Sequence, residues 1–272
     1  MKQKRFFIAL CAMLLTLTTT HAQCTLNNTA FQSGEYLTYN LYFNWKFVWV
    51  KVGNASMSTV KSNYQGKEAF RCSLITRGNG KLDAVFTMRD TLLSYITPQL
   101  TPLYFRKGAE EGKHYTIDEV FYTYTSDRCN MRMFRKKDKN PGKWTSASDS
   151  RCVVDMLNLF IRARNFDNSK WQPGYTLKLP VADGNGVEDA TLKYNGKETV
   201  KGDNGVKYRC LKLTYTEYSK RKRKWRELAT FYVTDDANHI PVRIDMNLNF
   251  GSAKAFVTNI KGNRNAITAN VK

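Results

Sequence analysis

The sequence is poor in the residues that carry most enzyme chemistry and metal binding. Histidine occurs three times in 272 residues, at His21, His114 and His239. There is no HxH, HExxH or GxSxG motif and no closely spaced cysteine pair. Histidine-activated nucleophiles and transition-metal sites require such groupings. We therefore predict no catalytic residue, no metal site and no cofactor, and these absences favour a protein that is not an enzyme.

Near the N-terminus the chain also lacks an apolar run long enough to cross a membrane as a helix. Residues 6–17 form an apolar stretch of 12 residues, whereas a spanning helix needs roughly 20. Basic residues precede this stretch and small polar ones follow it up to Ala22. This pattern predicts a secretory signal peptide over residues 1–22 and a periplasmic β-rich domain over residues 23–272. A retained membrane anchor is the alternative.

Cysteines are few, and outside the signal their number is odd. In an oxidising compartment they allow two disulfides at most. Cys129 and Cys152 flank a loop-rich stretch and are a possible pair, while Cys72 and Cys210 lie in strand-like segments and fit buried thiols. Lipidation of Cys24 is a further alternative. Because the large polar Gln23 precedes Cys24 instead of a small residue, we predict a soluble protein after cleavage.

Acidic residues are scarce relative to basic ones. The chain has 43 Lys and Arg against 23 Asp and Glu, and residues 1–22 contribute three basic residues and no acidic one, so the remainder has a net charge of +17. Such a charge favours anionic neighbours, which in the envelope are lipid head groups, acidic glycans or acidic proteins. The predicted export excludes nucleic acid. The alternative is a solvated basic surface without a specific ligand.

Alternation of apolar and polar residues dominates the chain and predicts strands. Leu37, Tyr39, Leu41 and Phe43 share one face of a strand, and Leu211, Leu213 and Tyr215 share a face of another. Turn sequences such as Asp-Gly-Asn-Gly at 183–186 separate the strands. The sequence thus predicts a mainly β fold, with a curved antiparallel sheet forming a half-barrel or a barrel-like structure. Further strands are expected near 46–60, 67–77, 84–95, 103–108, 115–124, 128–135, 174–181, 187–194, 229–234, 241–250 and 252–261.

A single amphipathic helix is predicted over residues 152–166, capped by Ser148, Asp149 and Ser150. This segment lacks Gly and Pro. Its apolar residues recur at helical spacing: Val153, Met156, Leu157, Phe160 and Ile161. One such helix among strands is expected to pack against the curved sheet or across its mouth.

Two sets of residues are candidates for ligand binding inside the sheet. Tyr39, Trp45 and Trp49 belong to an aromatic-rich stretch, and such side chains suit a cavity for lipid or glycan. Asp155 and Arg164 lie within the predicted helix. The alternatives are core packing for the aromatics and, for Asp155 with Arg162 or Arg164, a buried ion pair that ties the helix to the sheet.

Two basic loops, at 135–144 and 219–225, are predicted to cap hairpins and to contact an anionic membrane surface. Clustered cations favour anionic lipid, and a Trp suits the head-group region. The candidate contact residues are Lys136, Lys137, Trp144, Arg221, Lys222, Arg223, Lys224 and Trp225. Solvated hairpin tips are the alternative. The sequence Asp-Asp-Ala-Asn at 235–238 predicts a tight turn in preference to a cation site.

Three segments resemble the exported proteins of domain-of-unknown-function family 3108, over residues 31–261 in all. They span residues 31–57, 153–164 and 230–257. The resemblance implies an exported, mostly antiparallel β protein and no established activity. The residues that carry it are Gly34, Glu35, Tyr39, Gly53, Asp155, Arg164, Asp235, Asp236, Ile240, Pro241, Val242, Gly251 and Ser252.

These observations favour a non-enzymatic envelope protein that binds a lipid or another amphipathic ligand inside the curved sheet. The alternative is a structural or protein-interaction module with a basic face. A third possibility is an enzyme acting on polysaccharide, which no motif supports. The inner face of the sheet distinguishes the first two, because a ligand site requires apolar surface that the core does not fill.

Overall fold

The computed structural model describes residues 24–45, 48–80, 88–219, 222–248 and 251–271. The predicted signal peptide, residues 1–22, therefore lies outside the described residues. Within these ranges no helix has the length and apolarity that crossing a membrane would require.

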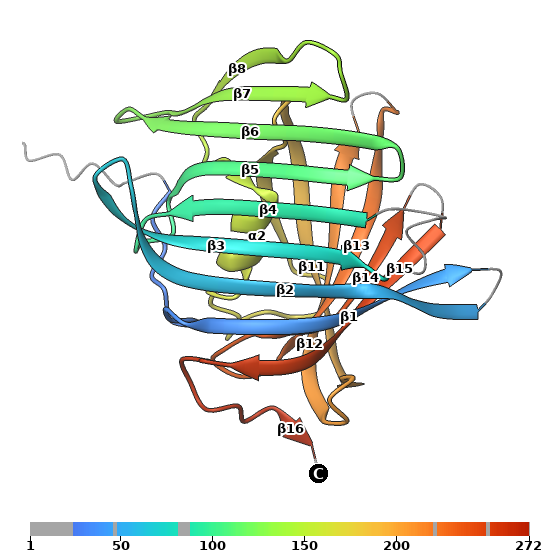
Figure 1. The fold of residues 1–272 in the computed structure, drawn as a ribbon. Helices are drawn as coiled ribbons and strands as arrows, with labels where there is room; N and C mark the ends of the chain where they lie inside the picture. The colour runs from blue at the N-terminus through green and yellow to red at the C-terminus, as the bar shows by residue number, and fades with distance from the viewer. Residues whose placement is uncertain (1–23, 46–47, 81–87, 220–221, 249–250, 272) are drawn as a thin grey trace, which may run out of the picture.

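Sixteen strands of the described chain join in one sheet (Figure 1). The strand order is β8-β7-β6-β5-β4-β3-β2-β1-β15-β14-β13-β12-β11-β10-β9, and β16 pairs with β12. All of these pairs are antiparallel except β9 with β10. The strands are β1 Glu35–Trp45, β2 Val48–Tyr64, β3 Lys67–Gly78, β4 Met88–Ile96, β5 Pro102–Glu111, β6 His114–Tyr124, β7 Cys129–Lys137, β8 Lys143–Asp149, β9 Val154–Asp155, β10 Thr176–Ala182, β11 Val187–Lys201, β12 Lys207–Ser219, β13 Lys224–Thr234, β14 Pro241–Leu248, β15 Gly251–Lys261 and β16 Asn270–Val271.

The alternation seen in the sequence sets which side chains face the core. Leu37, Tyr39 and Leu41 of β1 are buried, because every second residue of a strand points to the same side of the sheet. Gly53 on β2 lies close to β3, where a Cβ atom would come within 2.1 Å of the carbonyl oxygen of Arg77. A side chain at Gly53 would therefore push β2 and β3 apart.

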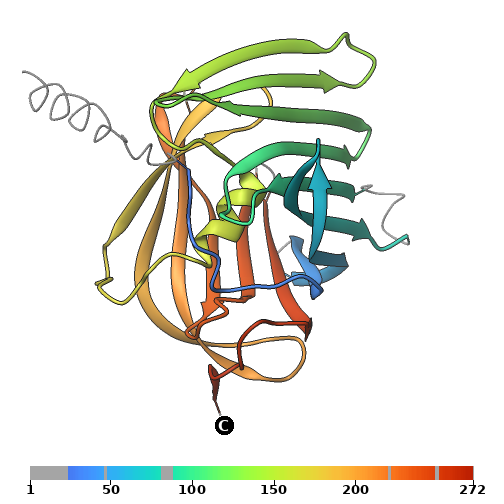
Figure 2. The same ribbon diagram turned by 90° about the vertical axis from the view of Figure 1, so that its left-hand side faces the viewer.

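The sheet curls into two walls that face each other across its inner side. In Figure 2 the wall formed by β1–β8 and the wall formed by β10–β15 enclose the short helix α2, Met156–Ala163. The end strands β8 and β9 do not pair, so the barrel-like sheet stays open. Side chains link the two walls near this gap: Arg135 of β7 contacts Asp183, and Arg151 contacts Asp189.

The helix exists as predicted but is shorter. Residues 143–149 form β8, so Asp149 belongs to a strand. The prediction that Asp149 helps to cap the helix is therefore wrong. Asp155 is the N-cap and accepts a hydrogen bond from the Asn158 N–H at 2.7 Å. The apolar stripe is partly wrong as well, since Met156 is exposed. The strand at 143–149 was not predicted, because this short segment is mostly polar and follows the turn sequence Asn-Pro-Gly at 140–142.

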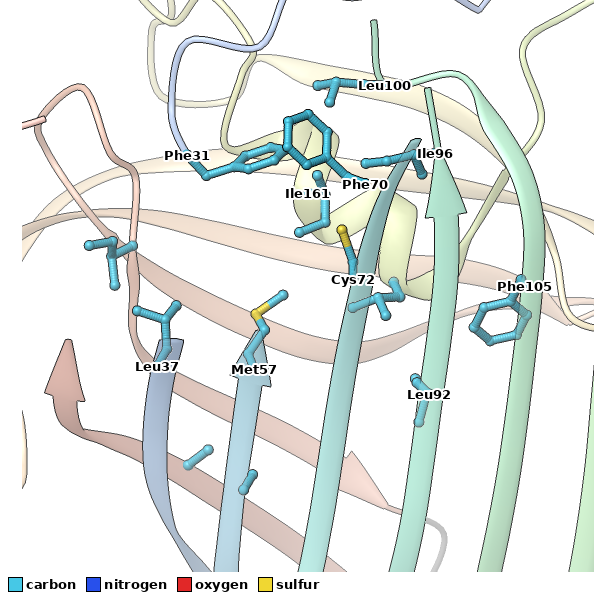
Figure 3. Packing of buried hydrophobic residues seen from close by; sticks show 14 of the residues in the cluster. Phe31, Leu37, Met57, Phe70, Cys72, Leu92, Ile96, Leu100, Phe105 and Ile161 are labelled. Atoms are coloured by element: carbon cyan, nitrogen blue, oxygen red, sulfur yellow. The ribbon is translucent and has the colours of Figure 1, made fainter. Parts of the chain in front are cut away.

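The core packs against both sides of α2. Ile161 and Leu157 belong to the larger cluster, which combines the inner residues of β1–β7 with residues of β10–β15. Leu159 belongs to the cluster against the β9–β14 wall. The ring of Phe160 lies 4.4 Å from that of Phe231 on β13. Figure 3 shows Ile161 beside Phe70 and Cys72 of β3 and Phe31 of the segment that precedes β1. Each fully buried side chain of this size contributes roughly 2 kcal/mol, so the helix is an integral part of the core.

Candidate functional site

Arg164, at the C-terminal end of α2, forms a buried ion pair with Glu35 of β1. The two guanidinium Nη atoms lie 2.5 and 2.8 Å from the two carboxylate oxygens, and both side chains are almost fully buried. Burial lowers the pKa of Arg164, but the charge and the hydrogen bonds of Glu35, with smaller contributions from Tyr39 and Cys72, together outweigh this effect, and the net pKa is raised. The predicted link between helix and sheet therefore exists, but the prediction of Asp155 as its acidic partner is wrong.

Asp155 forms no ion pair with an arginine in the described part of the chain. Its carboxylate accepts hydrogen bonds from the Asn158 N–H and from the Ser94 hydroxyl, the latter at 3.0 Å. Burial raises the pKa of Asp155 to about 7, although these hydrogen bonds oppose the shift. Asp155 thus fixes the start of α2 against β4.

Arg162 holds the N-terminal segment of the described chain against the helix. Its Nη1 donates to the carbonyl oxygens of Cys24 and Leu100, at 2.6 and 3.0 Å. Burial lowers the pKa of Arg162 to about 10. Cys24 forms a disulfide with Cys152, so the predicted pairing of Cys152 with Cys129 is wrong. The disulfide therefore provides a second link, beside the Arg162 hydrogen bond, between the N-terminal segment and the region of the helix.

The remaining cysteines and His239 also have structural roles. Cys72, Cys129 and Cys210 are buried free thiols, which confirms the prediction for Cys72 and Cys210. His239 Nδ1 lies 2.7 Å from the carbonyl oxygen of Arg164. The predicted turn at 235–238 is confirmed, because the Asp236 carboxylate accepts from the Asn238 N–H.

The five predicted ligand-binding residues do not form one site. Tyr39, Asp155 and Arg164 lie in the core beside α2, which we call the helix end of the sheet. Trp45 is the last residue of β1, and Trp49 follows on β2 at the opposite end. Cross-strand pairing brings that end of β1 and β2 next to the connected ends of β14 and β15, and we call it the open end (Figure 1).

At the open end, the inward-facing side chains of β1, β2, β14 and β15 extend beyond the packed core. Phe43 of β1 lies opposite Val50 on β2 and opposite Ala253 on β15. A bulge in β2 shifts the pairing after Leu41, and this turns Val50 and Val52 toward the inner side. Val52 accordingly packs against the core.

The apolar residues of these rows are exposed where they pass beyond the core. The exposed fractions are 61% for Val48, 38% for Val50 and 39% for Leu248. On the same inner face at the helix end, Leu37 is fully buried. Val48, Val50 and Leu248 are not among the residues predicted from the sequence to bind a ligand, although the alternation V-x-V-x-V at 48–52 is typical of a strand with one apolar face.

A cation and an aromatic ring border the open end. Lys254 Nζ lies 4.3 Å from the centre of the exposed Trp49 ring, and Lys51 beside them is exposed. A cation over a ring adds an attraction of about 1 kcal/mol. Trp49 pairs with Asn44, and Lys51 and Lys254 both pair with Tyr42. These positions alternate with the inner row, so the positive charge lies on the outer side of the strands whose inner side carries the exposed apolar side chains.

The predicted basic loops do cap hairpins. Lys136 and Lys137 end β7 and Trp144 lies on β8. Residues 222–223 lead into β13, which begins with Lys224 and Trp225. Trp144 and Trp225 are about half exposed, at 47% and 51%. Lys222, Arg223 and Lys224 are exposed too, and Arg221 lies outside the described residues. Their contact with a membrane stays a prediction.

The outer side of β6–β8 carries a groove of about 620 Å³. An aromatic row leads to it: the ring centres of Tyr104 and Phe121 are 5.0 Å apart, and those of Phe121 and Trp144 are 6.0 Å apart. The guanidinium of Arg132 stacks on Trp144 at 4.1 Å. Polar side chains, among them Asn130, complete the wall.

Beside α2 the described side chains leave little space. The cavity between the helix and the β12–β13 wall has a volume of about 30 Å³, which is room for about one water molecule. No group of three or more His, Cys, Asp or Glu residues in the described part of the chain is arranged to hold a metal ion. The helix end is thus a packed structural centre.

Comparison with known proteins places the chain in a family. A search of curated proteins found no match. Among solved structures, the β-barrel-like protein of the domain of unknown function DUF1849 from Brucella abortus is similar in fold, with a TM-score of 0.55 and 10% sequence identity, over 85% of this chain and 98% of that chain. The family model "Protein of unknown function (DUF3108)" matches residues 38–258. This match covers most of the sequence, and the chain therefore belongs to the DUF3108 family.

Proposed function

We propose that this chain is an exported, non-enzymatic protein that binds an amphipathic ligand with an anionic head group at the open end of its curved sheet. The apolar part of the ligand packs on the inner rows that contain Val48, Val50 and Leu248. The head group reaches over the ends of the strands to Lys51 and Lys254 on their outer side.

The observation that carries this proposal is the change in exposure along one inner face. Apolar side chains that face the core are covered at the helix end and uncovered at the open end, with Val48 at 61% exposure. Contiguous exposed apolar side chains on a soluble protein are typical of binding surfaces. Covering each of these side chains with an acyl chain contributes about 25 cal/mol per Å² of buried apolar surface.

The charge at the margin selects the head group. Lys254 and Lys51 lie beside Trp49, and a Trp beside cations is the usual composition of a surface that meets anionic lipid head groups. The net charge of +17 over residues 23–272 acts in the same direction at longer range. A neutral or cationic amphiphile would lack this attraction.

Two features support the exported setting. Residues 1–22 have the order of charged, apolar and small residues that secretory signals share. The disulfide between Cys24 and Cys152 fits an oxidising compartment and occupies the sulfur that lipidation of Cys24 would need. We therefore propose a periplasmic protein that is released after cleavage.

Native mass spectrometry of the protein purified without detergent from its own periplasm tests the proposal. We expect a protein-bound mass increment that organic solvent extracts as an acidic amphiphile. The double variant Val48→Asp and Val50→Asp should lose it, whereas Val271→Asp, a similarly exposed valine on β16, should keep it. A clean ligand-free mass under gentle ionisation would contradict the proposal.

A further inference from the structure

The two edges of the sheet are protected to very different degrees. The β9 edge has two residues, Val154 and Asp155, which are fully buried and lead directly into α2. The β8 edge is seven residues long, and in the described chain its backbone–backbone hydrogen bonds go to β7 alone. An unpaired strand edge is a template for the addition of another strand.

The β8 edge is also regular. Its pairing with β7 runs without a bulge from Lys143 opposite Arg135 to Asp149 opposite Cys129. No proline interrupts it, and its middle residues are small, with Ser146 exposed. Natural edges that must stay unpaired usually carry a bulge or a proline. The charged residues of β8 are Lys143 and Asp149 at its two ends. From the β10–β11 turn, the carbonyl oxygen of Asn185 accepts a hydrogen bond from the Thr145 hydroxyl at 3.2 Å.

The groove of about 620 Å³ lies directly beside this edge, on the outer side of β6–β8. Trp144, Ser146 and Ser148 line it from β8, and Arg132 lines it from β7. In strand addition the backbone of the bound segment supplies affinity, while neighbouring pockets receive every second side chain and supply specificity. The exposed Trp144, with Arg132 stacked on it, offers such a pocket.

The charge around the edge narrows the choice of partner. Residues 128–144 contain seven basic residues and one acidic residue. Arg132, Lys136 and Lys143 are exposed. A second copy of this chain would bring two such basic edges together, which like charges disfavour. An acidic segment is attracted instead.

From the free edge, the adjoining groove and the local charge, we infer that β8 binds an extended acidic segment of another protein by strand addition. The segment extends the sheet beyond β8, and its acidic side chains on the outer side meet Arg132 and Lys136. This surface is separate from the open end, and the inference does not depend on the proposed amphipathic ligand.

Titration with a nine-residue peptide of alternating Glu and Thr tests this inference, with the Lys-for-Glu peptide as the charge control. The acidic peptide should bind and should slow hydrogen exchange of alternate amides in residues 143–149. Methylation of every second peptide nitrogen, on the side that faces β8, should weaken binding tenfold or more while leaving the peptide charge unchanged. Equal binding of the methylated peptide would overturn the inference.

Matched variants at the two hairpins separate a specific site from general basic attraction. Arg132→Glu and Trp144→Ala should each weaken peptide binding about tenfold, and Lys224→Glu and Trp225→Ala at the β12–β13 hairpin should change it less than twofold. Equal losses at both hairpins would overturn the inference. If hydrogen exchange of the β8 amides slows as the protein concentration alone rises, the partner is a second copy and the inference is overturned. The inference is also overturned if phosphatidylglycerol vesicles slow this exchange and the peptide does not, because the partner is then a membrane.

Discussion

The helix end and the open end of the inner face differ although the same strands build both. At the helix end, α2 covers the apolar rows, and buried polar groups such as Arg164 and Glu35 are paired. At the open end the rows continue, but residues such as Val50 remain exposed. The alternation of apolar and polar residues in a strand therefore predicts which side chains face inward, but it does not predict whether other residues cover them. We attribute stability to the helix end and ligand binding to the open end, and the predictions below test this division.

The largest effect is expected from breaking the buried ion pair at the helix end. Arg164→Met leaves the Glu35 carboxylate buried without its partner, which should lower the free energy of unfolding by about 3–5 kcal/mol. Arg209→Met is the matched control, because Arg209 is 45% exposed and Asp235 keeps Lys197 as a second partner. This substitution should cost less than about 1 kcal/mol. Urea unfolding measures both. Equal losses in the two variants would contradict the structural role of Arg164.

Removal of the disulfide is expected to have the next largest effect. Cys24 and Cys152 are 128 residues apart in sequence, and opening a crosslink of this kind usually costs about 2–4 kcal/mol. The variant with both cysteines changed to alanine should unfold at a correspondingly lower urea concentration. Binding of the amphipathic ligand should persist under native conditions, because the open end does not contact the disulfide. A loss of binding without a loss of stability would argue against the division.

Protonation of the Asp155 carboxylate should make the free energy of unfolding depend on pH. Burial raises its folded-state pKa to about 7, whereas the pKa of an unfolded Asp is about 4. The folded state therefore holds the proton more tightly, and the contribution of Asp155 to stability decreases as pH rises from about 4 to about 7. The slope approaches 1.4 kcal/mol per pH unit at most.

Asp155→Asn should remove this contribution while keeping an oxygen that can accept from the Asn158 N–H. Urea unfolding of both proteins between pH 4 and pH 8 makes the comparison. If the two stability profiles run parallel, Asp155 does not titrate in this range and the helix end has no such pH dependence.

The smallest stability effect is expected at the open end. Val50→Ala removes a side chain that is already 38% exposed, so it should cost less than about 1 kcal/mol. Leu37→Ala, on the same inner face at the helix end, should cost about 2–5 kcal/mol. Thermal and urea unfolding of the two variants give the ratio. A cost at Val50 that matches that of Leu37 would mean that the open end is part of the stabilising core.

Local patterns predicted the strands because each pattern acts within a few residues. The alternation at 37–43 and the turn at 183–186 match β1 and the β10–β11 connection. The partners of Arg164 and Cys152 were not predictable, because Glu35 and Cys24 lie more than 120 residues away. The free edge β8 depends on the order of strands in the whole sheet. The exposure of Val48 and Val50 depends on how far α2 extends along the inner face of the sheet.

The central claim is that the open end binds the apolar part of an acidic amphiphile. Titration of the delipidated protein with fluorescently labelled phosphatidylglycerol tests it most directly, when wild type, the double variant Val48→Asp and Val50→Asp, and Val271→Asp are compared. The proposal predicts that the double variant binds roughly tenfold more weakly or worse, since burying a carboxylate against an acyl chain costs well over 1.4 kcal/mol, while Val271→Asp stays within twofold of wild type. Equal affinity of all three proteins, or no binding by wild type, would contradict it.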